Sequence, residues 1–292
     1  MKSSVQTLKT NGVDCILHTW NLTENPEAVI VVYHGFLAHA LYPTVRYLAE
    51  LLAKNNYAVF ALDMPGHGLS PGKRGYIASA DVLISHGLDV AEYAWNRYNK
   101  NGTKAKQKMF LCGSSMGGTI ASMTAQKRNA RFEVDGVVLL APMLKLSSQQ
   151  PMTRYLLKGL AYMFPTAAII PSSSTSGEKQ YRDPVKRKEA EEDELSVGGN
   201  LRLASASTCL ELCFSIADEF QNISFPLLAL VADEDVVVNN EGVVELMEKA
   251  KSKDKTEKHY KALHGLLCEP EPLINDIEAD ILEWISERCT NM

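Results

Sequence analysis

The chain alternates between short apolar runs and longer segments in which apolar residues recur every three or four positions. Within the runs, apolar residues barely alternate with polar ones, which is typical of strands covered on both faces of a sheet. These runs are 28–33 (AVIVVY), 57–62, 109–112 and 136–140. The helical segments between them are 45–54, 80–98 and 117–127. This order predicts an α/β protein with a mostly parallel sheet and right-handed crossovers.

The alternation stops at about residue 144 and resumes at about residue 224. The residues between contain no clear strand, and they end in a helix-like stretch at 201–220. Beyond them the pattern returns, with strands predicted at 226–232 and 258–263 and helices at 241–250 and 272–288. We therefore predict a core made of residues 1–143 and 224–292. We also predict that residues 144–223 form an inserted, mainly helical cap over the sheet.

Residues 113–118 read Gly-Ser-Ser-Met-Gly-Gly and fit the G-x-S-x-G pattern of a nucleophilic serine. Only Ser115 has glycines at both −2 and +2, because Ser114 is flanked by Cys112 and Met116. The pattern follows an apolar strand and opens a helical segment, which is the context that a nucleophile on a sharp turn requires. There the amide of Met116 would face a developing oxyanion. The alternative is a Gly-Ser loop without function.

Two other loops also follow predicted strands. The loop His34-Gly35-Phe36 stands where proteins with such a serine turn place the second oxyanion amide, so we predict Phe36 as its donor. An ordinary turn is the alternative. For the loop at 63–70 (DMPGHGLS) we expect a structural role, with His67 as a hydrogen-bonding loop residue and not a base.

A serine hydroxyl becomes nucleophilic at neutral pH when an imidazole takes its proton and a carboxylate fixes that imidazole. In proteins with such a serine turn, the acid comes after the serine in the chain and the base comes last. The acid follows a late strand of the sheet, and the base follows the last strand. The acids after the run 226–232 are Asp233, Glu234 and Asp235, and spacing alone does not choose among them. Of the two histidines beyond Ser115, His259 lies inside the last predicted strand. His264 follows that strand in a loop, so we predict His264 as the base.

The sequence resembles the monoacylglycerol lipases, in the lysophospholipase-like family of α/β-hydrolases, and among them the plant-type members most. The stretches that carry the resemblance are YHGF (33–36), LDMPGHGLSPGKRGYI (62–77), LCGSSMGGTIA (111–121), VVLLAPM (137–143), FPLLALVADEDVVV (225–238) and ALHGLL (262–267). The resemblance implies the α/β-hydrolase fold, with a central mostly parallel sheet flanked by helices and an inserted helical cap. It also places the family's acid on Asp235, with Asp233 as the alternative.

What the resemblance implies for function is ester hydrolysis by a serine hydrolase through an acyl-enzyme. Ser115, Asp235 and His264 would be the catalytic residues, and the amides of Phe36 and Met116 the oxyanion hole. The implied substrate is monoacylglycerol, cleaved to fatty acid and glycerol, with no cofactor and no metal. Alternatives are a lysophospholipase, a carboxylesterase for small hydroxycinnamoyl-type esters, a transacylase, and a non-enzymatic ligand receptor on the same fold.

Charge and hydropathy narrow the partners further. The net charge is −5 and the single basic run, 186–188, is followed at once by acidic residues, so we expect no nucleic-acid partner. The first residues lack the apolar core of a signal peptide, and no stretch is long and apolar enough to span a bilayer. We expect a cytoplasmic protein.

The apolar segment 155–170 of the cap is a candidate for transient contact with a membrane or lipid-droplet surface, or else a helix packed on the core. The pattern does not address the oligomeric state.

Overall fold

The computed structural model describes residues 2–99, 106–146, 151–171 and 176–290. Its main sheet has the strand order β1-β2-β4-β3-β5-β6-β9-β10 and is parallel from β4 to β10. The strands are β1 (Ser4–Thr10), β2 (Val13–Trp20), β3 (Val29–Tyr33), β4 (Ala58–Leu62), β5 (Met109–Ser114), β6 (Gly136–Leu140), β9 (Leu227–Ala232) and β10 (Lys255–Tyr260). The predicted mostly parallel α/β sheet is confirmed.

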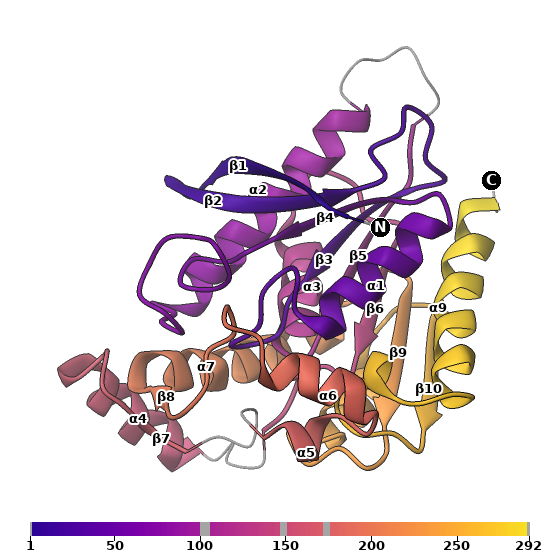
Figure 1. Ribbon diagram of the computed structural model, residues 1–292. Helices are drawn as coiled ribbons and strands as arrows, with labels where there is room; N and C mark the ends of the chain where they lie inside the picture. Colours follow the sequence, from indigo (N-terminus) through magenta and orange to yellow (C-terminus); the bar gives the residue numbers. More distant parts are fainter. Residues whose placement is uncertain (1, 100–105, 147–150, 172–175, 291–292) are drawn as a thin grey trace.

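Helices cover both faces of this sheet (Figure 1). The flanking helices are α1 (Pro43–Lys54), α2 (Ala80–Asn99), α3 (Met116–Lys127), α8 (Glu241–Lys249) and α9 (Leu273–Thr290). Successive residues of a strand point to opposite faces, so each buried strand contributes to two cores. In β3, Val29 and Val31 pack with α2 and α3, while Ile30 and Val32 pack with α1 and α9. This is why these runs are apolar at every position.

The sheet begins with an antiparallel hairpin that the hydrophobic pattern did not predict. Strands β1 and β2 are joined by Asn11 and Gly12, which have φ angles of 43° and 81°. Two residues with positive φ form the tight turn that suits the twist of a hairpin. The Asn-Gly pair was therefore a usable signal, although β1 is largely exposed and lacks an apolar run. Strand β10 also begins three residues earlier than predicted, in a charged stretch.

The described residues of the stretch 144–223 lie together on one side of the molecule (Figure 1). Their elements are α4 (Pro151–Met163), β7 (Ala168–Ile170), α5 (Gly177–Gln180), α6 (Pro184–Glu191), β8 (Leu201–Arg202), α7 (Leu203–Glu219) and the 3-10 helix η2 (Phe220–Asn222). The prediction that this stretch has no strand was wrong, because β7 and β8 pair as a small antiparallel sheet. Both strands are too short to produce a periodic pattern.

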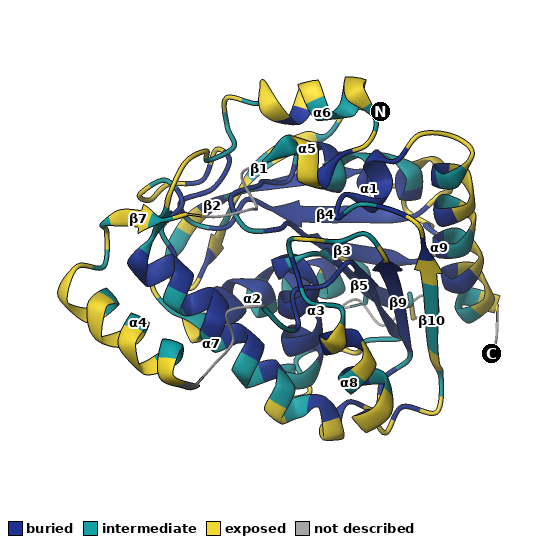
Figure 2. Cartoon of the chain, turned by 90° about the horizontal axis from the view of Figure 1, so that it is seen from below, coloured by how far each residue is buried: buried dark blue, intermediate teal, exposed yellow. Residues whose placement is uncertain are grey.

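Helix α7 connects this segment to the core, since it packs on α4 on one side and on α2 and α3 on the other. Figure 2 shows the contrast between α7, which is largely buried, and α4, whose outer face is exposed. In the described part of the chain, no helix has the length and apolar character needed to cross a bilayer.

Candidate active site

Ser115 occupies the sharp turn between β5 and α3. Its φ and ψ angles are 55° and −124°, a conformation that costs energy for a residue with a side chain. Backbone hydrogen bonds hold the turn in place: the Ser115 amide donates to Leu140 O at 3.0 Å, and the amides of Gly118 and Met143 donate to Ser115 O, each at 2.9 Å. The serine is thus fixed between the ends of β5 and β6.

The glycines on either side of Ser115 allow this turn because the backbone leaves no room for side chains. A Cβ atom on Gly113 would lie 2.1 Å from Gly117 O, and one on Gly117 would lie 2.0 Å from Tyr33 O. The start of α3 therefore packs directly against the end of β3. As the first residue of α3, Met116 has an amide with no acceptor inside the helix.

Asp235 and His264 lie together beside this turn. His264 Nδ1 is 2.6 Å from Asp235 Oδ2, and their side chains are 6% and 0% exposed. The second oxygen, Asp235 Oδ1, accepts hydrogen bonds from the amides of Val237 (2.7 Å) and Val238 (3.1 Å). A carboxylate held in this way fixes the imidazole through Nδ1 and leaves Nε2 for another partner.

The alternative acid and base pair with each other at a different place. Asp233 Oδ1 is 2.7 Å from His259 Nδ1, and both side chains are about half exposed. A second carboxylate, Glu257, approaches His259 Nε2 at 2.9 Å, and these contacts, Asp233 first, raise the pKa of His259. This exposed cluster does not line the cavity that contains Ser115.

Phe36 lies in the loop between β3 and α1, next to Ser115. A Cβ atom on Gly35 would lie 3.4 Å from Ser115 Cβ, so the two loops touch. Leu37 has a φ angle of 64°, in the left-handed region that a glycine adopts without strain. Unlike a glycine, Leu37 also contributes an apolar side chain to the cavity wall.

His34 fixes this loop, a role that the sequence analysis missed. Its Nδ1 donates to Gly35 O at 2.8 Å, and its Nε2 accepts the Met64 amide at 3.0 Å. Burial lowers the pKa of His34 to about 4, so the ring is neutral, as this donor–acceptor pattern requires. Burial also lowers the pKa of His67 to about 3, and its Nδ1 donates to Pro65 O at 3.1 Å. His67 is therefore a hydrogen-bonding loop residue, as predicted.

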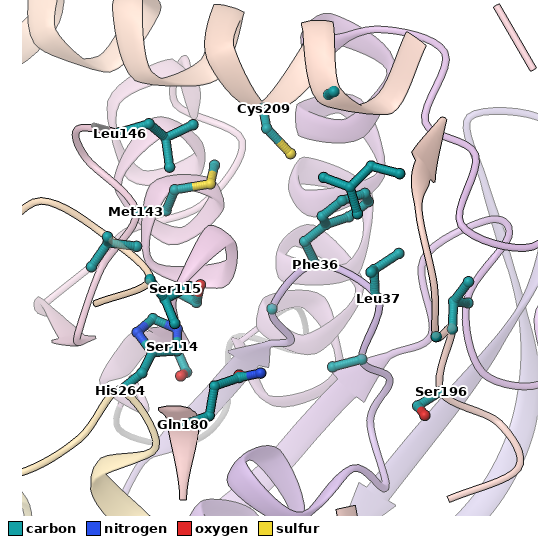
Figure 3. Close-up of a pocket in the computed structure, with 18 of the residues that line it drawn as sticks. Phe36, Leu37, Ser114, Ser115, Met143, Leu146, Gln180, Ser196, Cys209 and His264 are labelled. Atoms are coloured by element: carbon teal, nitrogen blue, oxygen red, sulfur yellow. The ribbon is translucent and has the colours of Figure 1, made fainter. Parts of the chain in front are cut away.

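A cavity of about 600 Å³ opens above Ser115. Figure 3 shows His264 and Gln180 on one side of Ser115, and Met143, Leu146 and Cys209 on the other side, toward α7. The larger apolar lining residues are Phe36, Leu37, Met143, Leu146, Leu157, Ile170, Val197, Leu201, Cys209, Leu210, Val236, Val237 and Val238. The polar ones with long side chains are Tyr42, Gln180, Tyr181 and Glu191, together with His264.

Several wall residues come from the segment 144–223, and sequence reasoning did not identify them. Tyr181 is buried, and its hydroxyl lies 3.0 Å from that of Tyr42 in the core. Asp193 pairs with the buried His39 at 2.9 Å, which ties the segment to the loop after Phe36. These contacts join residues more than 130 positions apart in the sequence, so no local sequence pattern predicts them.

The described residues contain no group of three or more His, Cys, Asp or Glu side chains arranged to hold a metal ion. The chemistry that the arrangement supports is nucleophilic: a hydroxyl on a strained turn, an imidazole with one nitrogen held by a buried carboxylate, and an adjoining apolar cavity.

Comparison with known proteins agrees with this geometry. Residues 24–271 match the family Hydrolase_4, described as serine aminopeptidase, S33. Human monoglyceride lipase is 30% identical over an alignment of 276 residues that covers 92% of this chain and 86% of that protein.

Two solved structures are similar over most of the chain. The monoacylglycerol lipase of Paleococcus ferrophilus has a TM-score of 0.76 at 25% identity, over 94% of this chain and 99% of that one. A soluble variant of monoglyceride lipase from Saccharomyces cerevisiae, in complex with a substrate analog, has a TM-score of 0.84 at 18% identity. The match covers 100% of this chain and 97% of that one. The second likeness concerns the fold alone. The chain belongs to the Hydrolase_4 family of α/β-hydrolases and is an ester hydrolase related to the monoglyceride lipases.

Proposed function

We propose that this protein hydrolyses monoacylglycerol to a free fatty acid and glycerol through an acyl-enzyme on Ser115. The observation that carries the proposal is the cavity, which is apolar on one side of Ser115 and polar on the side of His264. A single-chain ester has the same division, with an acyl chain on one side of its carbonyl carbon and an alcohol on the other.

The proposed mechanism assigns each step to a group. Ser115 Oγ attacks the ester carbonyl while His264 Nε2 takes its proton, and Asp235 holds Nδ1–H and stabilises the imidazolium. The amides of Phe36 and Met116 donate to the oxyanion. The C–O bond then breaks and Nε2 returns the proton to the leaving glycerol. Water attacks the acyl-enzyme in the same way, giving the fatty acid and the free serine.

His264 determines the orientation of the substrate in the cavity, because the imidazole that protonates the leaving alcohol must lie close to that alcohol. The alcohol then lies on the side of His264 and Gln180, and the acyl chain extends past Met143 and Cys209 toward α7. Each buried methylene of that chain contributes about 0.8 kcal/mol. Longer chains should therefore be preferred until the apolar part of the cavity is filled.

The charges around the cavity favour a neutral alcohol over a phosphate-bearing one. Among the described residues that line it, none is Lys or Arg, and one, Glu191, is acidic. A lysophospholipid would bring its phosphate toward this lining without a cation to pair with it, which is costly. Glycerol needs only hydrogen-bonding groups, and Tyr42, Gln180 and Tyr181 supply them.

We further propose that residues 144–223 act as the cap of this cavity and contact the lipid surface through α4. The exposed apolar residues of α4, the turn after it and β7 are Met152, Tyr155, Leu156, Leu160, Tyr162, Met163, Phe164 and Ile169, hereafter the α4 face. Exposed fractions of 80% for Met152 and 90% for Tyr162 mean that this face has no partner within the described chain. Large apolar side chains exposed together along one helix are typical of an interaction surface.

The experiment that tests the substrate compares esters that share one dodecanoyl chain and differ in the alcohol. We expect kcat/KM for 1-monododecanoylglycerol to exceed that for the lysophosphatidylcholine by at least about tenfold, because an unpaired buried polar group costs about 1–3 kcal/mol. A hydroxycinnamoyl ester of shikimate serves as the small-ester comparison. A higher kcat/KM for either of these would contradict the proposed substrate while leaving the hydrolase chemistry intact.

A further inference from the structure

Part of the inserted segment is bound to the loop that carries His264. The Gly265 amide donates to Gln180 O at 2.8 Å, and the Asp183 amide donates to Cys268 O at 3.1 Å. A Cβ atom on Gly265 would lie 2.4 Å from the Tyr181 ring. Residues 180–183 therefore lie in van der Waals contact with the His264 loop, with main-chain hydrogen bonds at both ends of the contact.

Arg182, in the middle of this contact, reaches both loops of the acid–base pair. Its Nη2 donates to Glu234 Oε2 at 2.7 Å, and Glu234 immediately precedes Asp235. Its Nε lies 3.1 Å from Glu269 Oε2, in the loop that follows His264. A guanidinium is a rigid planar fork, so one arginine can hold two carboxylates at a fixed separation and orientation, whereas the rotatable ammonium of a lysine does not fix their orientation.

Glu269 is a buried carboxylate, 1% exposed. Its Oε1 accepts the amide of Leu263, the residue before His264, at 2.6 Å. Its Oε2 has no hydrogen-bond partner among the described residues, so the contact with Arg182 is one of charge and not of hydrogen-bond geometry. Burial raises the pKa of Glu269, and the positive charge of Arg182 opposes that rise. Arg182 is thus the nearest counter-charge of a side chain that holds the backbone next to His264.

We propose that Arg182 and Glu269 are positioning residues that hold the Asp235 loop and the His264 loop in register. The inference rests on the proposed function, because it assumes that Asp235 and His264 work as a pair. The Arg182–Glu234 ion pair is more than a third exposed on both sides and contributes little to stability. Its effect is on geometry, and a small displacement of a catalytic group can cost up to about a hundredfold in rate.

The test measures kcat and KM on a water-soluble monoacylglycerol for the wild type and for Arg182→Gln, Glu269→Gln and the double variant. We expect Arg182→Gln to lower kcat by at least about tenfold with KM within about twofold. We expect the double variant to be no slower than Arg182→Gln alone, because residues that act through one contact have non-additive effects. Arg182→Lys should recover part of kcat, since it keeps the positive charge but lacks the planar fork that fixes the two carboxylates.

The matched control is Arg46→Gln, which removes a different ion pair between core and inserted segment, that of Arg46 in α1 with Glu189 in α6. Melting temperatures of all variants separate a loss of stability from a loss of kcat. Wild-type kcat in Arg182→Gln, a loss equal to that of Arg46→Gln, or multiplicative effects in the double variant would overturn the inference. If the wild type itself hydrolyses no ester, the proposed function fails instead, so the two failures are distinguishable.

Discussion

At the scale of single residues, the choice between Asp233 and Asp235 depends on the shape of one turn. Both follow β9, and they are only two positions apart. Asp235 points inward because the amides of Val237 and Val238 bind its Oδ1, which directs Oδ2 to His264. Asp233 stays at the surface with His259. The spacing left three acids open, and only the resemblance to a family favoured Asp235.

This difference predicts opposite outcomes for two otherwise equal substitutions. Asp235→Asn should lower kcat by about 10³- to 10⁴-fold, because the amide no longer fixes the tautomer and orientation of His264. Asp233→Asn should leave kcat within about threefold, since it affects an exposed pair. Both rates are measured on one soluble ester. A severe loss in Asp233→Asn with a mild one in Asp235→Asn would show that the acid has been misassigned.

At the scale of elements, close contact between backbones explains why the turn at Ser115 could be predicted from the sequence. Gly113 and Gly117 mark the turn at Ser115 because no side chain fits there, so a pattern of five residues predicts both the element boundary and the serine. The hairpin β1–β2 and the pair β7–β8 were missed for the opposite reason. Their strands are exposed or very short, so they have no apolar periodicity.

The same contact predicts how two glycine substitutions differ. Gly117→Ala should destabilise the fold by roughly 3 kcal/mol or more, because its Cβ would lie 2.0 Å from the carbonyl oxygen of Tyr33 in β3. Gly159→Ala, in α4 with no atom within 4 Å of the new Cβ, should raise stability by up to about 1 kcal/mol. Denaturant unfolding measures both. Equal changes in the two variants would mean that α3 does not pack on β3 so closely.

At the scale of the whole molecule, the sheet and its two cores followed from the hydrophobic pattern, whereas the cavity did not. Its walls combine Phe36 and Leu37 from the core with Gln180, Tyr181 and Cys209 from the inserted segment. The Arg182 bridge likewise joins three stretches of sequence that are far apart. Such contacts depend on the packing of the segment onto the core, and neither periodicity nor a motif encodes them locally.

The exposed α4 face predicts binding to lipid surfaces. Replacing Leu156, Tyr162 and Phe164 together by serine should lower binding to phosphatidylcholine vesicles by at least about tenfold, because each side chain would lose roughly 1.5–3 kcal/mol of burial. The three do not line the cavity, so turnover of a soluble ester should stay the same.

Vesicle sedimentation measures the effect. The control is the triple serine variant of Val5, Val185 and Val244, which are also apolar and exposed but lie outside the α4 face. An equal loss of binding in both triple variants, or no binding by the wild type, would contradict a role for α4.

The role of Ser115 is tested most directly by the hydrolysis of 1-monododecanoylglycerol by the wild type and by Ser115→Ala, measured side by side as released fatty acid. We expect multiple turnovers by the wild type and a loss of at least about 10³-fold in kcat for the variant, because the variant lacks the hydroxyl on which the acyl-enzyme forms. Comparable rates in the two proteins, or a similar loss in Ser114→Ala and not in Ser115→Ala, would contradict the assignment of Ser115 as the nucleophile.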